Sequence, residues 1–183
     1  MVAHRLTPKD EGALISAALR GDTNAYGELV GIHQARVYHL CLRFLGHCAE
    51  AQDAAQETFL AAYRALSRFE EGRALRPWLV TIASRICLNL LRRRRRGREV
   101  ELEETCSEGP GPEELAQAQF EKSRVERALD HLREVPRAVV VLFYLEDRSV
   151  AQVAEILSLS PSAVKVTLHR AREQLRGLLK ESV

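Results

Sequence analysis

Apolar residues recur every three or four positions along most of the chain, the spacing that places side chains on one side of an α-helix. Turn and capping residues interrupt this pattern at Gly21-Asp22, at Gly46 and at Ser160-Pro161. The segment 97–112 has no periodicity and contains Gly109-Pro110-Gly111-Pro112. We therefore expect an all-α protein made of two small helical domains joined by an extended linker.

Three helices are predicted before residue 68. A short amphipathic segment covers 11–20, a longer helix follows Asp22 and ends at Gly46, and a third covers about 49–67. The outward side of the third helix carries Asp53, Gln56, Glu57, Leu60 and Arg64. Such a side is ordinarily solvated surface, but an outward leucine among acids and amides also fits a docking face for another protein.

The fourth predicted helix, from Arg76 to Arg98, passes from an apolar into a highly charged environment. Pro77 suits its first turn. An apolar stripe then covers more than half of the circumference, through Trp78, Leu79, Ile82, Ala83, Ile86, Cys87, Leu90 and Leu91. A narrow second face is expected to lead out of the core toward the arginines that follow, through Thr81, Ser84, Arg85, Leu88 and Arg92. Six arginines between 92 and 98 are too many charges for a small domain to bury. A solvated tail that offsets the helix dipole is one interpretation, and contact with nucleic acid is the favoured one.

The segment 68–75 is predicted to be a loop between the third and fourth helices. It contains Gly72, two arginines and Phe69, an aromatic side chain able to stack on a base. Taken alone, this composition is a weak indication of nucleic-acid contact.

Charge is segregated along the chain, although the formal net charge is only +2. Eight glutamates and no Lys or Arg occur from 99 to 121, directly after the arginine run. Five Lys or Arg against one Glu occur from 165 to 180. This alternation indicates two polyanion contacts separated by an acidic segment.

The second domain is predicted to begin near Gln119 and to contain a helix-turn-helix motif. Ser149 and Gln152 form a capping box for one helix, Ser158-Leu159 breaks the pattern, and Ser160-Pro161 restarts it. Two helices joined by so short a turn match the motif whose second helix enters the major groove of DNA. A plain helical hairpin with a basic face is the alternative.

The last helix carries candidates for both kinds of DNA contact. Residues near its start, where base edges are expected, are Ser162, Ala163, Val166 and His169, with Ser160 just before them. Side chains long enough to reach phosphates are Lys165, Arg170, Arg172 and Arg176.

Composition narrows the class of protein further. No apolar run approaches the roughly 18 residues of a membrane span, and charges occupy the start of the chain where a signal peptide would be apolar. We expect a cytoplasmic protein with no membrane insertion. Cys41 and Cys87 fall on apolar stripes and are expected to be reduced core thiols, and His33 a core or boundary histidine. A metal or redox role for Cys41, His47 and Cys48 stays open, although zinc sites usually show tighter paired spacing.

These motifs together resemble the bacterial RNA polymerase sigma factors of the extracytoplasmic-function group, from about Glu11 to Lys180. Region 2 of that family is matched by Gly21-Asp22, by Asp53 to Phe59, and by Arg76-Pro77-Trp78-Leu79 with Ile82-Ala83. Region 4 is matched by Ser149 to Leu178. The order and spacing of these motifs make the resemblance specific.

The resemblance implies a division of roles along the chain. Residues 11–97 would be region 2, which docks on core polymerase and recognises and melts the minus-ten element. Residues 98–118 would be a flexible acidic linker, and 119–182 would be region 4, which binds the minus-thirty-five element. The implied polymerase-binding residues are Asp53, Gln56, Glu57 and Leu60. The implied region-2 DNA contacts are Phe69, Arg73, Arg76, Arg85, Asn89, Arg92 and Arg93. The partners would be core RNA polymerase, promoter DNA and an anti-sigma factor, and neither cofactor nor metal is implied.

Two other classes of function are weaker interpretations. A DNA-binding regulator that never docks on polymerase would need only the helix-turn-helix. An enzyme would need a carboxylate pair, a Cys/His dyad or a glycine-rich phosphate loop at workable spacing, and the sequence shows none of these.

Overall fold

The protein is described by a computed structural model, which places residues 8–96, 128–129 and 131–180. Over these residues helices are joined by short turns and loops and no strand occurs, which confirms the expected all-α fold class. The predicted linker, which contains the fourth cysteine, Cys106, and the start of the second domain lie outside the described residues. None of the helices in the described ranges is long and apolar enough to cross a membrane.

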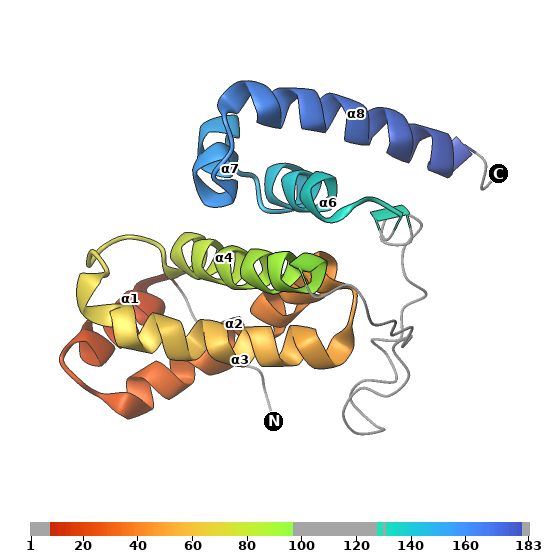
Figure 1. Ribbon diagram of the computed structural model, residues 1–183. Coiled ribbons are helices and arrows are strands. Elements are labelled where there is room, and N and C mark those ends of the chain that lie inside the picture. Colours follow the sequence, from red (N-terminus) through yellow and green to blue (C-terminus); the bar gives the residue numbers. More distant parts are fainter. Residues whose placement is uncertain (1–7, 97–127, 130, 181–183) are drawn as a thin grey trace.

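The first domain consists of α1 (Pro8–Leu19), α2 (Thr23–Leu45), α3 (Cys48–Ala65), the 3-10 turn η1 (Leu66–Arg68) and α4 (Leu75–Arg96). Helices α2, α3 and α4 pack against one another, and α1 packs against α2 (Figure 1). The predicted apolar stripes form the core, with Leu29, Leu40 and Phe44 almost fully buried. Burial of side chains this large is the main stabilising contribution to a small domain.

The ends of α2 are set by local chemistry that the sequence predicted. The Asp22 carboxylate accepts hydrogen bonds from the backbone N–H groups of Asn24 and Ala25, at 2.9 and 3.2 Å. Gly46 ends the helix with φ of 74°, a left-handed conformation, and its N–H donates to the Leu42 carbonyl at 2.8 Å. The chain therefore turns sharply into α3.

The second domain contains α6 (Glu134–Val140), the π-helical turn η2 (Val141–Leu145), α7 (Val150–Leu157) and α8 (Pro161–Lys180). The predicted capping box of α7 is present: the Ser149 N–H donates to Gln152 Oε1 at 3.0 Å, and the Gln152 N–H donates to Ser149 Oγ at 3.2 Å. Ser158 adopts a left-handed conformation with φ of 55° in the turn to α8. Ser160 caps α8 by accepting the Ala163 N–H at 3.1 Å.

The two domains are in direct contact. Helix α7 lies against α4, while α6 and η2 lie against α2, so buried apolar residues of both domains form one continuous cluster. In Figure 1 the second domain sits on the α4 side of the first domain, away from α3. The outward side of α3 is therefore left uncovered by the second domain.

Candidate nucleic-acid and protein-binding surfaces

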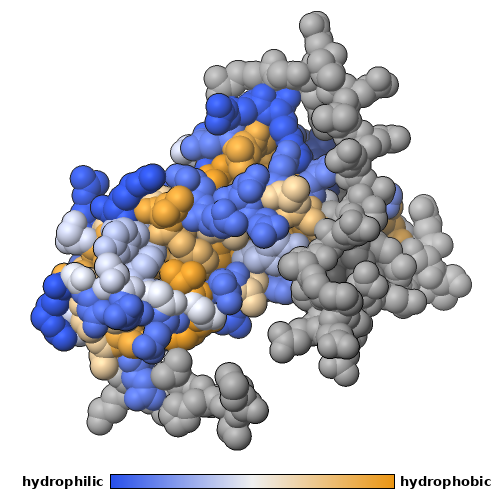
Figure 2. All heavy atoms as spheres, turned by 90° about the horizontal axis from the view of Figure 1, so that it is seen from below, coloured by the Kyte–Doolittle hydropathy of each residue, from blue (hydrophilic) through white to orange (hydrophobic). Residues whose placement is uncertain are grey.

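The outward side of α3 is arranged as the sequence predicted. Asp53, Gln56, Glu57 and Leu60 are all exposed, and the Leu60 side chain keeps 52% of its accessible surface. Tyr63, one turn further, is 45% exposed. A leucine and a tyrosine among acidic side chains give the mixture of apolar and polar surface that protein interfaces use. Figure 2, which views the molecule from below, likewise shows apolar patches between hydrophilic side chains.

This side of α3 is held by α2. The Tyr26 hydroxyl donates to the Phe59 carbonyl at 2.6 Å, and the Tyr26 and Tyr63 rings lie 4.8 Å apart. Burial, and secondarily the nearby Tyr63, raises the pKa of Tyr26 to about 12. The hydroxyl therefore remains a donor over the neutral and moderately alkaline range.

The basic residues of α4 do not form one surface. Arg85, Asn89 and Arg92 share an exposed side, and Arg93 beside them is exposed as well. Arg76 precedes Arg85 by nine residues, about two and a half turns, which places it on the opposite side of the helix. The predicted region-2 contacts therefore lie on two separate surfaces.

The predicted narrow face of α4 is partly wrong. Ser84 is fully buried and Leu88 is 6% exposed, so neither leads toward solvent. Ser84 tolerates burial because its hydroxyl donates to the Val80 carbonyl at 2.7 Å, which satisfies its polar group within the helix. Small hydroxyl side chains can thus belong to an apolar stripe.

Arg94 makes a set of contacts that the sequence did not predict. Its guanidinium binds both carboxylate oxygens of Glu50 at the start of α3, with Nε 3.0 Å from Oε1, and its Nη1 lies 3.3 Å from the Leu45 carbonyl. The end of α4 is thereby tied to the corner between α2 and α3. Arg94 differs from its exposed neighbours Arg92 and Arg93 in being engaged within the protein.

The loop before α4 presents its arginine but not its aromatic ring. Arg73 is exposed and forms an ion pair in which its Nε lies 2.6 Å from Glu70 Oε2. Phe69 is only 8% exposed, and its ring lies 5.1 Å from that of Trp78. Stacking of Phe69 on a base would therefore require the ring to leave this packing.

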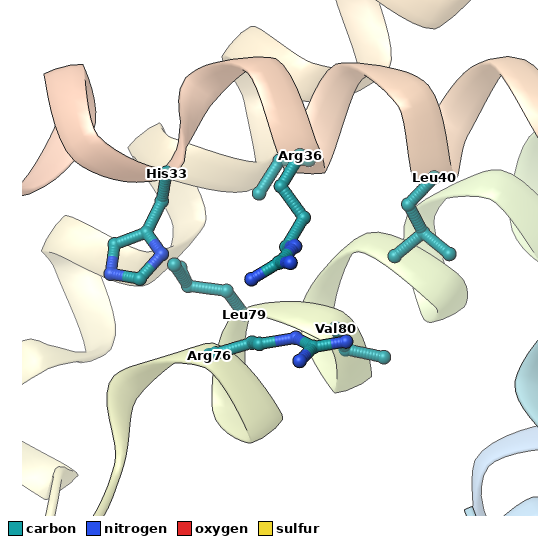
Figure 3. A pocket seen from close by; sticks show the side chains of 7 residues that line it. His33, Arg36, Leu40, Arg76, Leu79 and Val80 are labelled. Carbon is teal, nitrogen blue, oxygen red and sulfur yellow. The ribbon is translucent and has the colours of Figure 1, made fainter. Parts of the chain in front are cut away.

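Arg76 faces the space between α2 and α4. Figure 3 shows Arg36 of α2 and Arg76 of α4 extending toward a shallow pocket whose other lining residues include His33 and Leu79. His33 is 7% exposed and its Nε2 lies 3.0 Å from Glu11 Oε1, so the expectation of a boundary histidine with a polar partner is confirmed.

Helix α8 buries one set of side chains and exposes most of the predicted DNA contacts. Val164, Leu168 and Ala171 are buried. The predicted contacts Ser160, Ser162, Lys165, Val166, His169, Arg170, Arg172 and Arg176 are exposed, and Ala163 is partly exposed. Ser162, Val166 and His169 follow one another along a single side of the helix, with Arg172 and Arg176 beside them. This arrangement can present base-reading side chains between phosphate-binding ones.

The cysteines bear on the remaining question of metal binding. Cys41 and Cys87 are fully buried and free, as expected, and Cys48 is partly exposed. A hydrogen bond with Cys41, together with burial, raises the pKa of the Cys87 thiol. Within the described ranges, no three His, Cys, Asp or Glu side chains are grouped as metal ligands would be.

Comparison with known proteins identifies the family. The model of Sigma-70 region 2 matches residues 29–97, and that of Sigma-70, region 4 matches residues 122–175. The RNA polymerase sigma factor NccH of Alcaligenes xylosoxydans xylosoxydans is 32% identical, over 96% of this chain and 97% of the relative. The ECF RNA polymerase sigma factor SigM of Mycobacterium tuberculosis is 30% identical, over 93% of this chain and 85% of the relative. The solved structure of CnrH in complex with the cytosolic domain of CnrY superposes with a TM-score of 0.62, at 30% identity over 94% of this chain and 99% of that one. The chain belongs to the RNA polymerase sigma factors, within their ECF subfamily.

Proposed function

We propose that the protein binds core RNA polymerase and directs it to specific promoters, acting as a DNA-binding subunit without catalytic activity of its own. The observation that carries this proposal is the exposed side of α8, where Ser162, Val166 and His169 are flanked by basic side chains on a helix-turn-helix scaffold. Such a helix can read the minus-thirty-five element in the major groove.

The first domain supplies the other two contacts in this proposal. The exposed side of α3, with Asp53, Gln56, Glu57 and Leu60, would dock on the polymerase. The exposed side of α4, with Arg85, Asn89, Arg92 and Arg93, would contact the minus-ten element, together with Arg73 of the preceding loop. We assign residues 11–97 to region 2 and 119–182 to region 4, with the acidic linker between them.

A protein partner that holds the factor inactive is part of the same proposal. The structurally similar CnrH was solved in complex with the cytosolic domain of CnrY. By this likeness we infer that an anti-sigma factor binds the present chain, and that the chain acts in the cytoplasm, where polymerase and promoter DNA are found.

The decisive experiment is transcription by a reconstituted holoenzyme. Purified chain is mixed with core polymerase and a library of promoter fragments, and the start sites of the RNA products are sequenced. Initiation from a defined subset with shared upstream elements supports the proposal. DNA binding without any recruitment of core polymerase would instead indicate a separate DNA-binding regulator.

A further inference from the structure

The loop before α4 is anchored at both ends and closed by a tight turn in between. Phe69 and Leu75 are buried, whereas the residues between them are all exposed. The Arg73 N–H donates to the Glu70 carbonyl at 3.2 Å, and Gly72 has φ of 88°, a left-handed conformation that glycine adopts without strain. The exposed part of the loop is therefore a compact turn on the surface of the first domain.

Helix α1 reaches this turn. Ser16 Oγ on α1 donates a hydrogen bond to Oε1 of Glu71, the second residue of the turn. The two residues are 55 positions apart in the sequence, and Figure 1 shows α1 beside the loop. A hydrogen bond from a hydroxyl group to a carboxylate is stronger than one between neutral groups. The turn is thus tied to α1 in addition to its connection with α4.

Helix α1 can serve as a fixed support because it is anchored on α2. Ile15 and Ala18, on either side of Ser16 in the sequence, lie in the core with 4% of their surface exposed. Near the start of α1, Glu11 Oε1 lies 3.0 Å from Nε2 of His33 on α2. The hydrogen bond between Ser16 and Glu71 therefore connects the turn to the packed core of the domain.

Both glutamates of the turn are engaged, and an arginine is presented to solvent. Glu70 Oε2 lies 2.6 Å from Arg73 Nε, and Glu71 accepts the hydrogen bond from Ser16. The Arg73 side chain nevertheless remains 72% exposed. A carboxylate released beside a nucleic-acid strand would repel its phosphates. Holding Glu71 against α1 therefore favours the approach of such a strand to Arg73.

We propose that Ser16 is a positioning residue for the 68–75 loop, which it holds through Glu71 in the arrangement that receives the separated promoter strand. A loop that is ordered before binding loses less conformational entropy when the strand arrives. Helix α1 thereby becomes part of the minus-ten site. This inference rests on the proposed function, in which Arg73 contacts the minus-ten element.

The first test asks whether the hydrogen bond orders the turn in the free chain. Ser16→Ala removes the hydroxyl group and Ser16→Thr keeps it, while Ser67→Ala is the matched control that removes an exposed hydroxyl group next to the same loop. Amide hydrogen exchange of the peptide 69–75 is followed by mass spectrometry. Exchange should be about threefold to tenfold faster in Ser16→Ala, the factor expected for one net hydrogen bond, and close to wild type in the other two variants.

The second test measures promoter melting by the holoenzyme. Permanganate footprints should show that Ser16→Ala lowers the equilibrium constant for promoter opening by about threefold to tenfold, with near-normal binding to the closed promoter. Ser16→Thr should restore opening. In a Glu71→Ala background, Ser16→Ala should have no further effect, because the acceptor of its hydrogen bond is already absent. Urea denaturation should give similar stabilities for all these variants, since the bond lies on the surface.

Each outcome supports or overturns a defined part of the inference. Equal exchange rates in Ser16→Ala and Ser67→Ala would overturn the ordering of the turn. Faster exchange with normal melting, or additive losses in the Ser16→Ala, Glu71→Ala double variant, would overturn the positioning role and retain the proposed function. Absence of initiation by the wild-type protein with core polymerase would reject the proposed function and the positioning role together, while exchange in the free chain would still show whether Ser16 orders the turn.

Discussion

The guanidinium of Arg94 binds Glu50 through two of its nitrogens, with Nε 3.0 Å from Oε1, across 44 residues of sequence. Its remaining nitrogen reaches the Leu45 carbonyl at the end of α2. Such a forked pair fixes direction as well as distance. Of the run's arginines whose side chains the structure describes, Arg94 therefore holds α4 in place, while Arg92 and Arg93 face solvent.

We expect Arg94→Gln to lower the free energy of unfolding by about 1 kcal/mol, because a partly exposed forked pair and its carbonyl contact are lost. Urea denaturation of the full chain provides the measurement. The salt slope of DNA binding should stay at the wild-type value, since Arg94 is already engaged. Arg93→Gln is the matched control: it should leave the stability unchanged and reduce the slope by about 0.9. A loss of stability in Arg93→Gln together with a reduced slope in Arg94→Gln would contradict this division.

Reversal of charge on α3 should weaken polymerase binding. The variant Asp53→Lys, Glu57→Lys alters two exposed side chains, so the fold should persist, while the affinity for core polymerase should fall at least tenfold if both lie in the interface. Competition with labelled wild-type protein for core polymerase measures the effect. The control is the double variant Glu28→Lys, Glu155→Lys. It makes the same charge change at exposed positions on α2 and α7. Equal competition by the two double variants would reject the α3 docking face.

Substitutions on α8 should separate affinity from sequence preference. Arg172→Ala should weaken binding to all DNA sequences and reduce the salt slope by about one unit, because it removes a phosphate contact. Val166→Ala and His169→Ala should instead change which upstream sequences are selected from a random library. A change of preference in Arg172→Ala without a change of slope would show that these roles are exchanged.

The Phe69 ring is expected to contribute to the stability of the fold, because it is buried. Phe69→Ala removes a buried ring that packs on Trp78, so the free energy of unfolding should fall by about 3 kcal/mol.

The part of the 68–75 loop in promoter melting is tested by Arg73→Gln, because the Arg73 side chain is exposed. Permanganate footprints of the holoenzyme should show reduced melting for Arg73→Gln with near-normal promoter binding. Unaltered footprints would remove Arg73 from the melting step.

The raised pKa of Tyr26 predicts a loss of stability in alkali. The unfolded chain ionises Tyr26 near its ordinary pKa of 10, whereas the folded protein holds the proton until about pH 12. Folding therefore favours the protonated form, and this contribution is complete below pH 10 and is lost as the pH rises from about 10 to 12. Urea midpoints of wild type and Tyr26→Phe should converge over this range. Parallel curves would exclude Tyr26 as the titrating group.

Features that depend on neighbouring residues could be predicted from the sequence. The caps at Asp22 and Ser149, the left-handed Gly46 and the buried stripe of α8 all follow from local spacing and backbone chemistry. Exposure of the predicted docking residues on α3 followed from the same periodicity. Each of these features is decided within one or two helical turns.

The features that sequence reasoning missed depend on distant residues. Periodicity shows that one side of α4 is buried, but it does not show that the second domain covers part of it or that Glu146 lies beside Arg76, 70 residues away. The sequence could not show that Arg94 pairs with Glu50, because Arg94 lies within a run of identical residues. Phe69 was assigned to an open loop because its packing partner, Trp78, belongs to the following helix.

The division of α8 into a buried stripe and an exposed stripe has an evolutionary consequence. Val164, Leu168 and Ala171 are buried and carry the packing, while Ser162, Val166 and His169 are exposed. Under the proposed role of α8, duplicated copies of such a gene can diverge in promoter preference while the packing residues stay unchanged. For the same reason, libraries randomised at these three exposed positions should yield mostly folded factors, from which new promoter specificities can be selected.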